Sequence, residues 1–352
     1  MRTPVTEPEP TPAKASTIYD VAKEAGVSSQ TVVRYLNGFK GIRPATQLKV
    51  QTAIETLKYR PNQLARALRT NSPTRVLLFV NELSEAGPAN IILAATQAAS
   101  AAGYVLEIIT LDVEDIESST HTIRETDQLY VAGALALIPT PQIAELFDRF
   151  PLHVPFVREI NGDGLEGPHA QGPEEAGTVL QIEHLHELGH ERILLLNGPD
   201  GWYSTEKRRT TAVFTAEQFG MRVTESIHGD WSSRSGYEAL MRAALDDAPT
   251  AVVAANDEMA LGALCALDER GIDVPTAMSV IGFDDTRGAG YYKPPLTTIR
   301  VDFANAGRIA VQRLLADIAR AAGEESEAPA PVGAVPPRLV ARKSTAPALG
   351  RP

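Results

Sequence analysis

The sequence predicts a small all-α head followed by a large α/β core that contains parallel sheets. The head is marked by its charge: residues 14–70 carry ten Lys or Arg and three Asp or Glu, whereas the 352-residue chain has a net charge of −11. The core is marked by short apolar runs that alternate with helix-length stretches from Arg75 onward, a pattern typical of βαβ units. A basic head on an acidic body favours a polyanionic partner for the head alone, although a solvated basic face would have the same composition.

The composition also limits the class of protein. The first fifteen residues are rich in Pro, Thr and Glu and lack the apolar segment of a secretory signal, so a disordered tail is predicted there. No apolar run approaches the roughly 18 residues that span a bilayer, so we expect a cytoplasmic protein without membrane contact. Cys265 is the only cysteine, which excludes an internal disulfide, and its apolar surroundings predict a thiol in the core.

Three helices are predicted in the head. Thr17 and Asp20 form the pattern of a capping box, which starts a first helix that Gly26 ends. A second helix is expected over about 28–36, and a third starts at Pro44.

The spacing of the first two helices is that of a helix-turn-helix unit. Two short helices joined by a glycine turn must pack closely, and Ala22, four residues before Gly26, is the small residue that permits this. The predicted apolar seam consists of Val21, Ala25, Val27, Val32 and Tyr35, with Val50, Ile54 and Leu57 on the third helix.

In such a unit the second helix lies in the major groove of DNA, and residues near its N-terminal end reach the base edges. The base-reading candidates are Ser29, Gln30 and Arg34. Gln30 can pair with adenine and Arg34 with guanine, each worth about 1–3 kcal/mol of discrimination. Candidates for phosphate contacts are Tyr19, Ser28, Thr31, Asn37 and Thr46. Helix capping or surface polarity would also account for these residues.

Two segments, "YDVAKEAGVSSQTV" and "YRPNQLARALRT", resemble the DNA-reading head and the hinge of LacI/GalR-family repressors. The hinge segment holds about eight helical residues, too few for a stable isolated helix. The resemblance implies that two hinge helices, one per subunit, form only when paired in the minor groove. It assigns this contact to Asn62, Ala65, Leu68 and Arg69, with Leu68 as a wedge between base pairs. The alternative is a leucine in a plain linker.

The apolar runs of the core include "RVLLFV", "YVLEIIT", "ALALI", "RILLLN", "TAVVAA" and "MSVIGFD". They predict parallel sheets with ligands at the carboxyl ends of the strands. The sequence contains no Gly-rich phosphate loop, Gly-x-Ser-x-Gly elbow or kinase motif, so we expect neither an enzyme nor a cofactor. The resemblance implies a two-lobed, periplasmic-binding-protein-like core with a cleft between the lobes.

The resemblance also implies an effector pocket. "PTAVVAANDEMALGAL" and "SVIGFDD" place Asn256 and Asp284 toward ligand hydroxyls, and "STEKRRTTAVF" does so for Arg208. A one-residue slip would select Arg209, and a surface basic pair is the alternative for both arginines. Asp285, next to Asp284, leaves open a carboxylate pair for acid/base chemistry.

Two aromatic residues narrow the ligand class. "GDWSSRSGY" and "TTIRVDF" are similar to family segments that carry sugar-stacking residues, which fall on Trp231 and Phe303. Because flat aromatic faces pack against the C–H patches of a pyranose, a galactoside-like ligand is favoured over a purine. Core packing is the alternative for Phe303.

The chain also departs from the family pattern. After the first core strand it reads "NELSEAGPANII", which leaves the pocket wall near Asn81 and Glu82 uncertain, although Asn81 stays a candidate for effector binding. "VPFVREI" brings Arg158 and Glu159 toward the place of an expected aspartate, a charged pair that would suit an acidic or substituted sugar. In the head, Val33 replaces a usual serine, so the operator can differ from familiar ones.

Residues 186–190, "HELGH", have the His-Glu-x-x-His spacing of a zinc protease. That chemistry needs an unbroken helix and a third ligand. Gly189 is instead typical of a helix C-cap, which would place His190 beyond the helix and away from His186. We therefore expect no metal site.

These observations predict a DNA-binding transcriptional regulator, a repressor of carbohydrate-utilisation genes. It would bind a pseudo-palindromic operator as a homodimer and be released by a small sugar, although co-repression stays open. The tail "STAPALGRP" has no leucine heptads, which argues against a larger assembly. The alternatives are a sugar receptor without DNA function, and a metal- or carboxylate-dependent hydrolase.

The predicted domains are a disordered tail at 1–15, a helix-turn-helix DNA-binding domain at 16–60, a hinge helix and linker at 61–72, a two-lobed effector-binding and dimerisation core at 73–346, and a C-terminal tail at 347–352.

Overall fold

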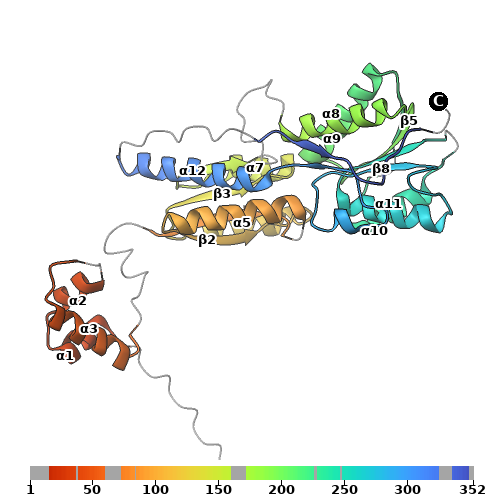
Figure 1. Cartoon of the computed structure of the whole chain (residues 1–352). Coiled ribbons are helices and arrows are strands. Elements are labelled where there is room, and N and C mark those ends of the chain that lie inside the picture. Colours follow the sequence, from red (N-terminus) through yellow and green to blue (C-terminus); the bar gives the residue numbers. More distant parts are fainter. Residues whose placement is uncertain are drawn as a thin grey trace, which may run out of the picture. The chain divides into compact units, whose positions relative to one another are not determined.

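The computed structural model describes residues 16–36, 39–59, 73–83, 85–159, 172–225, 228–245, 248–324 and 335–348. The chain forms two compact units, Met1–Pro73 and Thr74–Pro352 (Figure 1). The domain boundaries predicted within them stay predictions.

The first unit is the all-α head. Its helices are α1 (Ile18–Ala25), α2 (Ser29–Leu36) and α3 (Pro44–Thr56). The predicted capping box is confirmed, because the Thr17 side chain accepts from the backbone of Asp20 while the Asp20 carboxylate accepts from the backbone of Thr17. Gly26 ends α1 in the left-handed region at φ 65°, as predicted.

A small apolar cluster holds the three helices together. Its buried members are Val21, Ala22, Ala25, Val32, Val50 and Ala53, and partly buried side chains packed against them include Val27, Tyr35, Ile54 and Leu57. The predicted seam is therefore confirmed.

The first lobe of the second unit is built on a parallel sheet in the order β2-β1-β3-β4. The strands are β1 (Arg75–Val80), β2 (Val105–Thr110), β3 (Gly133–Leu137) and β4 (Phe156–Glu159), and the helices are α5 (Ala86–Ala101), α6 (Ile116–Thr126), α7 (Pro141–Arg149) and α12 (Phe303–Ala321). Alternate residues of β1 enter two apolar clusters: Leu78 packs with residues of α5 and α12, and Phe79 packs with residues of α6 and α7. Helices thus cover both faces of the sheet, which explains the continuous apolar run of β1.

The second lobe repeats this design with a parallel sheet in the order β6-β5-β7-β8. The strands are β5 (Arg192–Leu196), β6 (Arg222–Glu225), β7 (Ala251–Ala254) and β8 (Ser279–Ile281), and the helices are α8 (Pro173–Glu187), α9 (Tyr203–Gln218), α10 (Ser233–Arg242) and α11 (Asp257–Glu269), with the short 3-10 helix η1 (Ala289–Tyr291). Leu194 packs with α10 and α11, whereas Leu195 packs with the side of α8 and α9.

The chain passes between the lobes repeatedly. It leaves the first lobe after β4 and returns to it through β9 (Thr298–Arg300) and α12. After α12 it forms β10 (Arg338–Val340), which pairs antiparallel with β9 (Figure 1). The C-terminal segment joins the second lobe through Ser344, whose carbonyl accepts from the backbone N–H of Val280 at 2.7 Å. The predicted two-lobed core of parallel sheets is confirmed.

The "HELGH" stretch is a helix end. Helix α8 stops at Glu187, and Gly189 follows in the left-handed region at φ 80°, as predicted. The His186 ring stacks on Phe219 with centroids 4.4 Å apart, while the His190 ring bonds to Thr250 at 2.9 Å. Among the described residues no group of three or more His, Cys, Asp or Glu side chains is arranged to hold a metal ion.

The prediction for Cys265 was wrong. Its thiol is exposed, although it lies on α11, whose neighbouring residues Leu264, Ala266 and Leu267 are buried. The apolar sequence around it identified the helix correctly but did not show which face the thiol occupies.

None of the described helices combines the length and apolar character that a membrane span needs.

Candidate functional site

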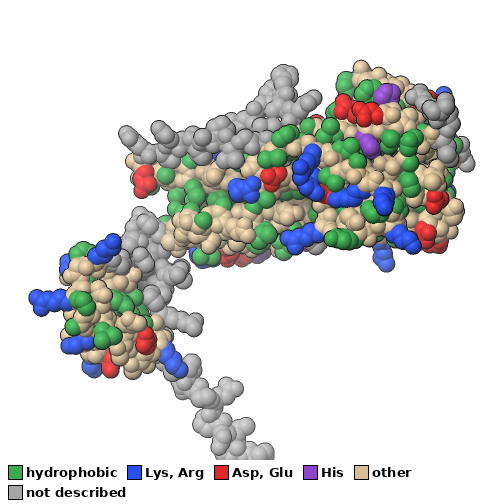
Figure 2. Space-filling view, in the orientation of Figure 1, with side chains coloured by type: hydrophobic (Ala, Val, Ile, Leu, Met, Phe, Trp, Pro, Cys, Tyr) green, Lys and Arg blue, Asp and Glu red, His purple; other side chains and the backbone are tan. Residues whose placement is uncertain are grey.

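The surface of α2 carries the residues predicted to read DNA. Gln30 and Arg34 are exposed and Ser29 is half-buried, all on this short helix. The Arg34 guanidinium lies over the Phe39 ring, 5.5 Å from its centroid, and Phe39 is itself 54 % exposed. Figure 2 shows more basic than acidic side chains on the visible face of the head. Sequence reasoning missed Phe39, which positions the arginine.

The candidates for phosphate contact divide into two groups. Ser28 Oγ accepts from the backbone N–H of Thr31 at 3.2 Å and lies 2.9 Å from its hydroxyl, so this pair caps α2. Tyr19 is 72 % exposed, and Thr46 is half-buried in the first turn of α3. The remaining phosphate candidate, Asn37, lies outside the described residues, as do the four minor-groove candidates of the hinge, Asn62, Ala65, Leu68 and Arg69.

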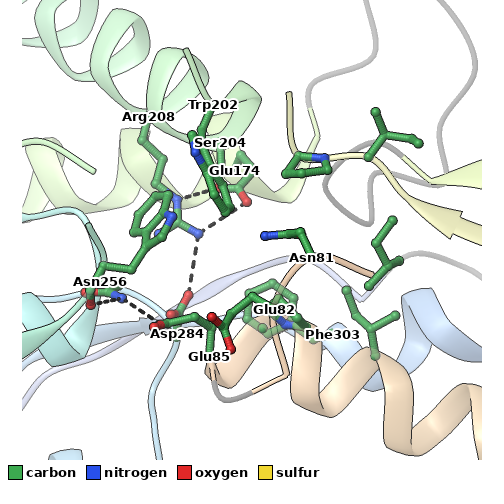
Figure 3. A pocket seen from close by; sticks show the side chains of 17 residues that line it. Asn81, Glu82, Glu85, Glu174, Trp202, Ser204, Arg208, Asn256, Asp284 and Phe303 are labelled. Atoms are coloured by element: carbon green, nitrogen blue, oxygen red, sulfur yellow. Dashed lines mark hydrogen bonds and ion pairs between the residues drawn. The ribbon is translucent and has the colours of Figure 1, made fainter. Parts of the chain in front are cut away.

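A cavity lies between the two lobes of the second unit, with about 710 Å³ of empty space that includes some open solvent (Figure 3). All six predicted effector residues line it, namely Asn81, Arg208, Trp231, Asn256, Asp284 and Phe303. Asn81 follows β1, Asn256 follows β7, and Asp284 follows β8. The carboxyl ends of parallel strands therefore supply the polar wall, as expected for open α/β sheets.

Arg208 forms the centre of the polar wall. Its side chain is only 10 % exposed, and its guanidinium bonds to the Glu174 carboxylate and to the carbonyl of Ala255. A further nitrogen of the guanidinium lies 3.5 Å from Asp284 Oδ1 (Figure 3). The guanidinium carbon lies 3.8 Å from the centroid of the Phe283 ring. A buried guanidinium held on several sides is a fixed donor for ligand oxygens.

Arg209, the alternative to Arg208, does not line this cavity. Its guanidinium pairs with Glu225 at 3.2 Å and with Glu206 at 3.6 Å, where the side chain is 32 % exposed. Of the two arginines, Arg208 is the one that the fold turns into the cleft.

Asp284 is an acceptor that opens into the cavity. Its side chain is 8 % exposed, and Oδ1 contacts Arg208, whereas within the described part of the chain Oδ2 forms no hydrogen bond. Burial raises the pKa of Asp284 well above its usual range, although the charge of Arg208 acts in the opposite direction. Its backbone has φ 106°, a conformation that non-glycine residues rarely adopt.

Asp285 does not form a catalytic pair with Asp284. Its carboxylate bonds to Arg300 and Arg342, its side chain is 4 % exposed, and it does not line the cavity. The two adjacent carboxylates therefore face different partners.

Asn256 caps α11 and also bridges the cleft. Its Oδ1 accepts from the backbone N–H of Met259 at 2.8 Å, and its Nδ2 donates to the carbonyl of Trp231 at 3.0 Å and to Glu85 Oε2 at 3.4 Å. Glu85 lies in the first lobe, so this contact joins the lobes.

The aromatic wall contains one residue that the sequence did not single out. Trp231 is 7 % exposed and packs edge-on against Trp202, with ring centroids 5.9 Å apart. Trp202 precedes α9 and lines the same cavity. The sequence places Trp202 just before a predicted helix, but no motif in the sequence identified it as a residue of the pocket. Gly198 permits this arrangement, because a Cβ there would lie 2.5 Å from the Trp231 ring.

Phe303 packs in an apolar cluster and also lines the cavity. It is 8 % exposed, clusters with Ile91 and Ala306, and lines the opposite side of the cleft (Figure 3).

The carboxylates Glu82, Glu85 and Glu174 also line the cavity. Burial, together with the nearby charges of Glu82, Glu258 and Asp230, raises the pKa of Glu85 to about 7. Sequence reasoning named Glu82 as part of an uncertain wall and missed Glu85 and Glu174.

The proposal of a charged pair near the ligand was wrong. Arg158 bonds to Asp148 at 2.6 Å, and Glu159 lies 3.5 Å from Arg313 of α12. Neither residue lines the cavity: successive side chains of β4 point to opposite sides of the sheet, so Arg158 is exposed beside Asp148 and Glu159 is buried beside α12.

Comparisons with known proteins agree with this architecture. Residues 17–62 match the model for bacterial regulatory proteins of the lacI family, and residues 182–345 match that for a periplasmic binding protein-like domain. The chain is 33 % identical over 304 residues to the lactose operon repressor of Escherichia coli (strain K12), which covers 86 % of this chain and 84 % of that protein. It is 32 % identical over 339 residues to the HTH-type transcriptional repressor PurR of Escherichia coli O1:K1 / APEC, covering 94 % of this chain and 97 % of that protein.

A solved structure shows the same likeness in three dimensions. The crystal structure of the lac repressor dimer bound to operator and the anti-inducer ONPF superposes with a TM-score of 0.80 and 31 % identity, covering 95 % of this chain and all of that one. With a helix-turn-helix head, a two-lobed core and relatives over most of its length, the chain belongs to the lacI family of bacterial regulatory proteins and is a DNA-binding transcriptional regulator.

Proposed function

We propose that the protein is a cytoplasmic repressor of carbohydrate-utilisation genes that leaves its operator when a small sugar binds between the lobes. The cavity is the observation that carries this proposal. A fixed guanidinium, an open carboxylate oxygen and two indole rings line one space. Carboxylates and guanidinium groups bind hydroxyls, and indole rings pack on the C–H faces of a pyranose.

Specific ligand contacts follow from these positions. Asp284 accepts hydroxyl hydrogens at Oδ2, Arg208 donates to ring or hydroxyl oxygens, and Trp231 stacks on the sugar face, with Phe303 opposite. Asn81 supplies a further polar group in the first lobe. Asn256 contacts the ligand and also donates to Glu85, so it links ligand binding to the contact between the lobes. A galactoside-like ligand fits this mixture of polar and aromatic groups.

The proposed DNA complex is a homodimer on a pseudo-palindromic operator. A helix-turn-helix unit reads one half-site, and a two-fold axis places the second unit on the other half. The lac repressor structure named above is likewise a dimer bound to operator. Gln30 and Arg34, with Ser29, read bases in this proposal, and Tyr19, Ser28, Thr31, Asn37 and Thr46 contact phosphates.

The proposed hinge contact completes the regulatory path. Asn62, Ala65, Leu68 and Arg69 would enter the minor groove at the operator centre, with Leu68 as the wedge. Closure of the cleft around a sugar changes how the lobes lie, and a coupling of about 1–3 kcal/mol is typical of such regulation. Because the hinge is short, this amount is enough to release the operator.

Selection of duplexes from a random pool by the full-length protein at low salt tests the DNA part of the proposal. We expect an enriched palindrome with two half-sites. Enrichment of a single half-site would contradict the dimer, and absence of enrichment would contradict the repressor function.

A further inference from the structure

The cleft between the lobes is strongly acidic. Among the described residues, the inner cavity is lined by Glu82, Glu85, Glu174 and Asp284 against one basic residue, Arg208. The positive charge of Arg208 is already balanced by Glu174, which it contacts through two of its nitrogens. Carboxyl groups therefore outnumber basic groups among the described residues that line the inner cavity.

An adjoining outer space continues this charge. It shares Glu82, Glu85 and both tryptophans with the inner cavity, and it adds three more acidic residues, Asp112, Glu114 and Asp230. The described residues that line this outer space include no Lys, Arg or His. Because the two spaces share walls, a ligand longer than one sugar ring can occupy both.

This charge distribution selects among sugar ligands. Carboxylates in a partly enclosed cleft repel carboxylated or phosphorylated sugars, because like charges at short range cost free energy in a medium of low dielectric constant. The same groups attract a cation. Trp202 and Trp231 border both spaces, and indole faces bind cations as well as sugar rings.

Two further features distinguish this cleft from a merely acidic surface. Asp284 is more than nine-tenths buried, and its Oδ2 opens into the cavity without a hydrogen bond from the described part of the chain. At the boundary with the outer space, burial and the charges of Glu82, Glu258 and Asp230 raise the pKa of Glu85 to about 7. A ligand cation at this point would relieve the repulsion among these groups.

We propose that the effector is an amino sugar, a glycoside whose protonated amine lies between Glu82, Glu85 and Asp230 while a neutral ring contacts Asp284 and Arg208. The inference rests on the proposed sugar-responsive function and names the ligand class of that site. It replaces the acidic sugar that the sequence suggested.

Calorimetric titration of the full-length protein with matched sugars tests this inference. One set is galactose, galactosamine and N-acetylgalactosamine. The other set consists of β-1,4-linked glucose disaccharides with a hydroxyl, ammonium or acetamide group at C2. In at least one set we expect the ammonium form to bind about tenfold more tightly than both neutral forms, because a hydrogen bond to a charged group contributes more than one between neutral groups. The advantage should shrink as NaCl is raised.

Isosteric variants show whether the cleft carboxylates cause the preference. Glu82→Gln and Glu85→Gln should each weaken the ammonium form about fivefold to tenfold while leaving the neutral forms within twofold. Glu145→Gln is the matched control, because Glu145 is an exposed carboxylate on α7 that lines neither space. Thermal unfolding and operator affinity of each variant show that it is folded.

The outcomes separate this inference from the proposed function. Equal affinities for the three forms in both sets, tighter binding of a neutral form, or no binding of any ammonium form would overturn the amino-sugar inference. An ammonium preference that survives both cleft variants would overturn it as well. Release of the operator by a neutral galactoside would leave the proposed function standing in each of these cases. If no sugar of any kind binds or releases the operator, the proposed function itself fails.

Discussion

The amide Nδ2 of Asn256, in the second lobe, donates to Glu85 Oε2, in the first lobe, across 3.4 Å. The same side chain caps α11 through Oδ1. One residue therefore joins the stability of a helix to the closure of the cleft, and substitutions at this position can separate the two roles.

Asn256→Asp keeps an oxygen that can cap α11 but places a carboxylate against Glu85. We expect its free energy of unfolding in urea to stay within about 1 kcal/mol of the wild type, because Asp and Asn are comparable N-caps. Effector affinity should fall by about tenfold, since the bridge becomes a repulsion. Asn256→Ala loses the cap and should be destabilised by about 1–2 kcal/mol. Equal effector affinity in Asn256→Asp and wild type would show that the bridge does not matter.

Arg208→Lys tests the guanidinium at the centre of the cavity. Lys cannot reproduce the contacts with Glu174, Ala255 and Asp284 together, so we expect a loss of about 3 kcal/mol in unfolding free energy. The effector should bind at least about tenfold more weakly. Arg209→Lys is the matched control, because its ion pairs are partly exposed and worth about 0–1 kcal/mol. Similar losses in the two variants would contradict the role assigned to Arg208.

Glu85 should make stability depend on pH in a defined direction. Its pKa rises from 4.5 to about 7 in the folded protein, so between these values the folded chain holds a proton that the unfolded chain releases. The stabilisation of the folded state that Glu85 contributes is therefore complete below about pH 4.5, and it is lost as the pH rises to about 7. After allowance for solvent screening of a partly exposed group, the loss is about 1–2 kcal/mol.

Comparison with Glu85→Gln isolates this contribution. Burial lowers the pKa of His184 and His190, whose effect on stability has the opposite sign, so only the difference between variant and wild type is diagnostic. In urea titrations at pH 4.5, 5.5 and 7, the variant should gain stability relative to the wild type as the pH rises. A constant difference would disprove the pKa assigned to Glu85.

Arg34→Ala should relax DNA specificity at one position of each half-site. A bidentate arginine–guanine pair is worth about 1–3 kcal/mol of discrimination. Lys49→Ala is a suitable control, because Lys49 is an exposed cation on α3 rather than on the reading helix. We expect the control to weaken all operator variants about equally and to reduce the salt dependence. Competition binding with single-base operator variants distinguishes the two patterns.

The sequence predicted most accurately those features that depend on local chemistry. The capping box at Thr17, the stop at Gly26 and the helix end at Gly189 are set by a few neighbouring residues. Asn256 and Asp284 were assigned to the pocket by resemblance to family segments, and each lies two or three residues beyond the end of a parallel strand. The lining of the cavity by these residues matches expectation, while their roles in binding stay predictions.

Features that depend on packing between distant segments were not predictable. Glu174 reaches the cavity because Arg208 of another helix holds it there, and Glu85 because the lobes face each other. Arg158 and Glu159 were placed near the ligand from their position in the sequence, whereas β4 turns them toward Asp148 and Arg313. Cys265 was assigned to the wrong face of its helix for the same reason.

Coupling between the cavity and the operator is the central prediction for this protein. Fluorescence anisotropy with the selected operator, in the presence and absence of the best-binding sugar, measures that coupling for the wild type and for Asp284→Asn. We predict that the sugar weakens operator binding of the wild type by about tenfold or more and leaves that of Asp284→Asn nearly unchanged, because the open carboxylate is the proposed hydroxyl acceptor. A wild-type operator affinity that does not respond to bound sugar, or an equal response in both proteins, would contradict the account.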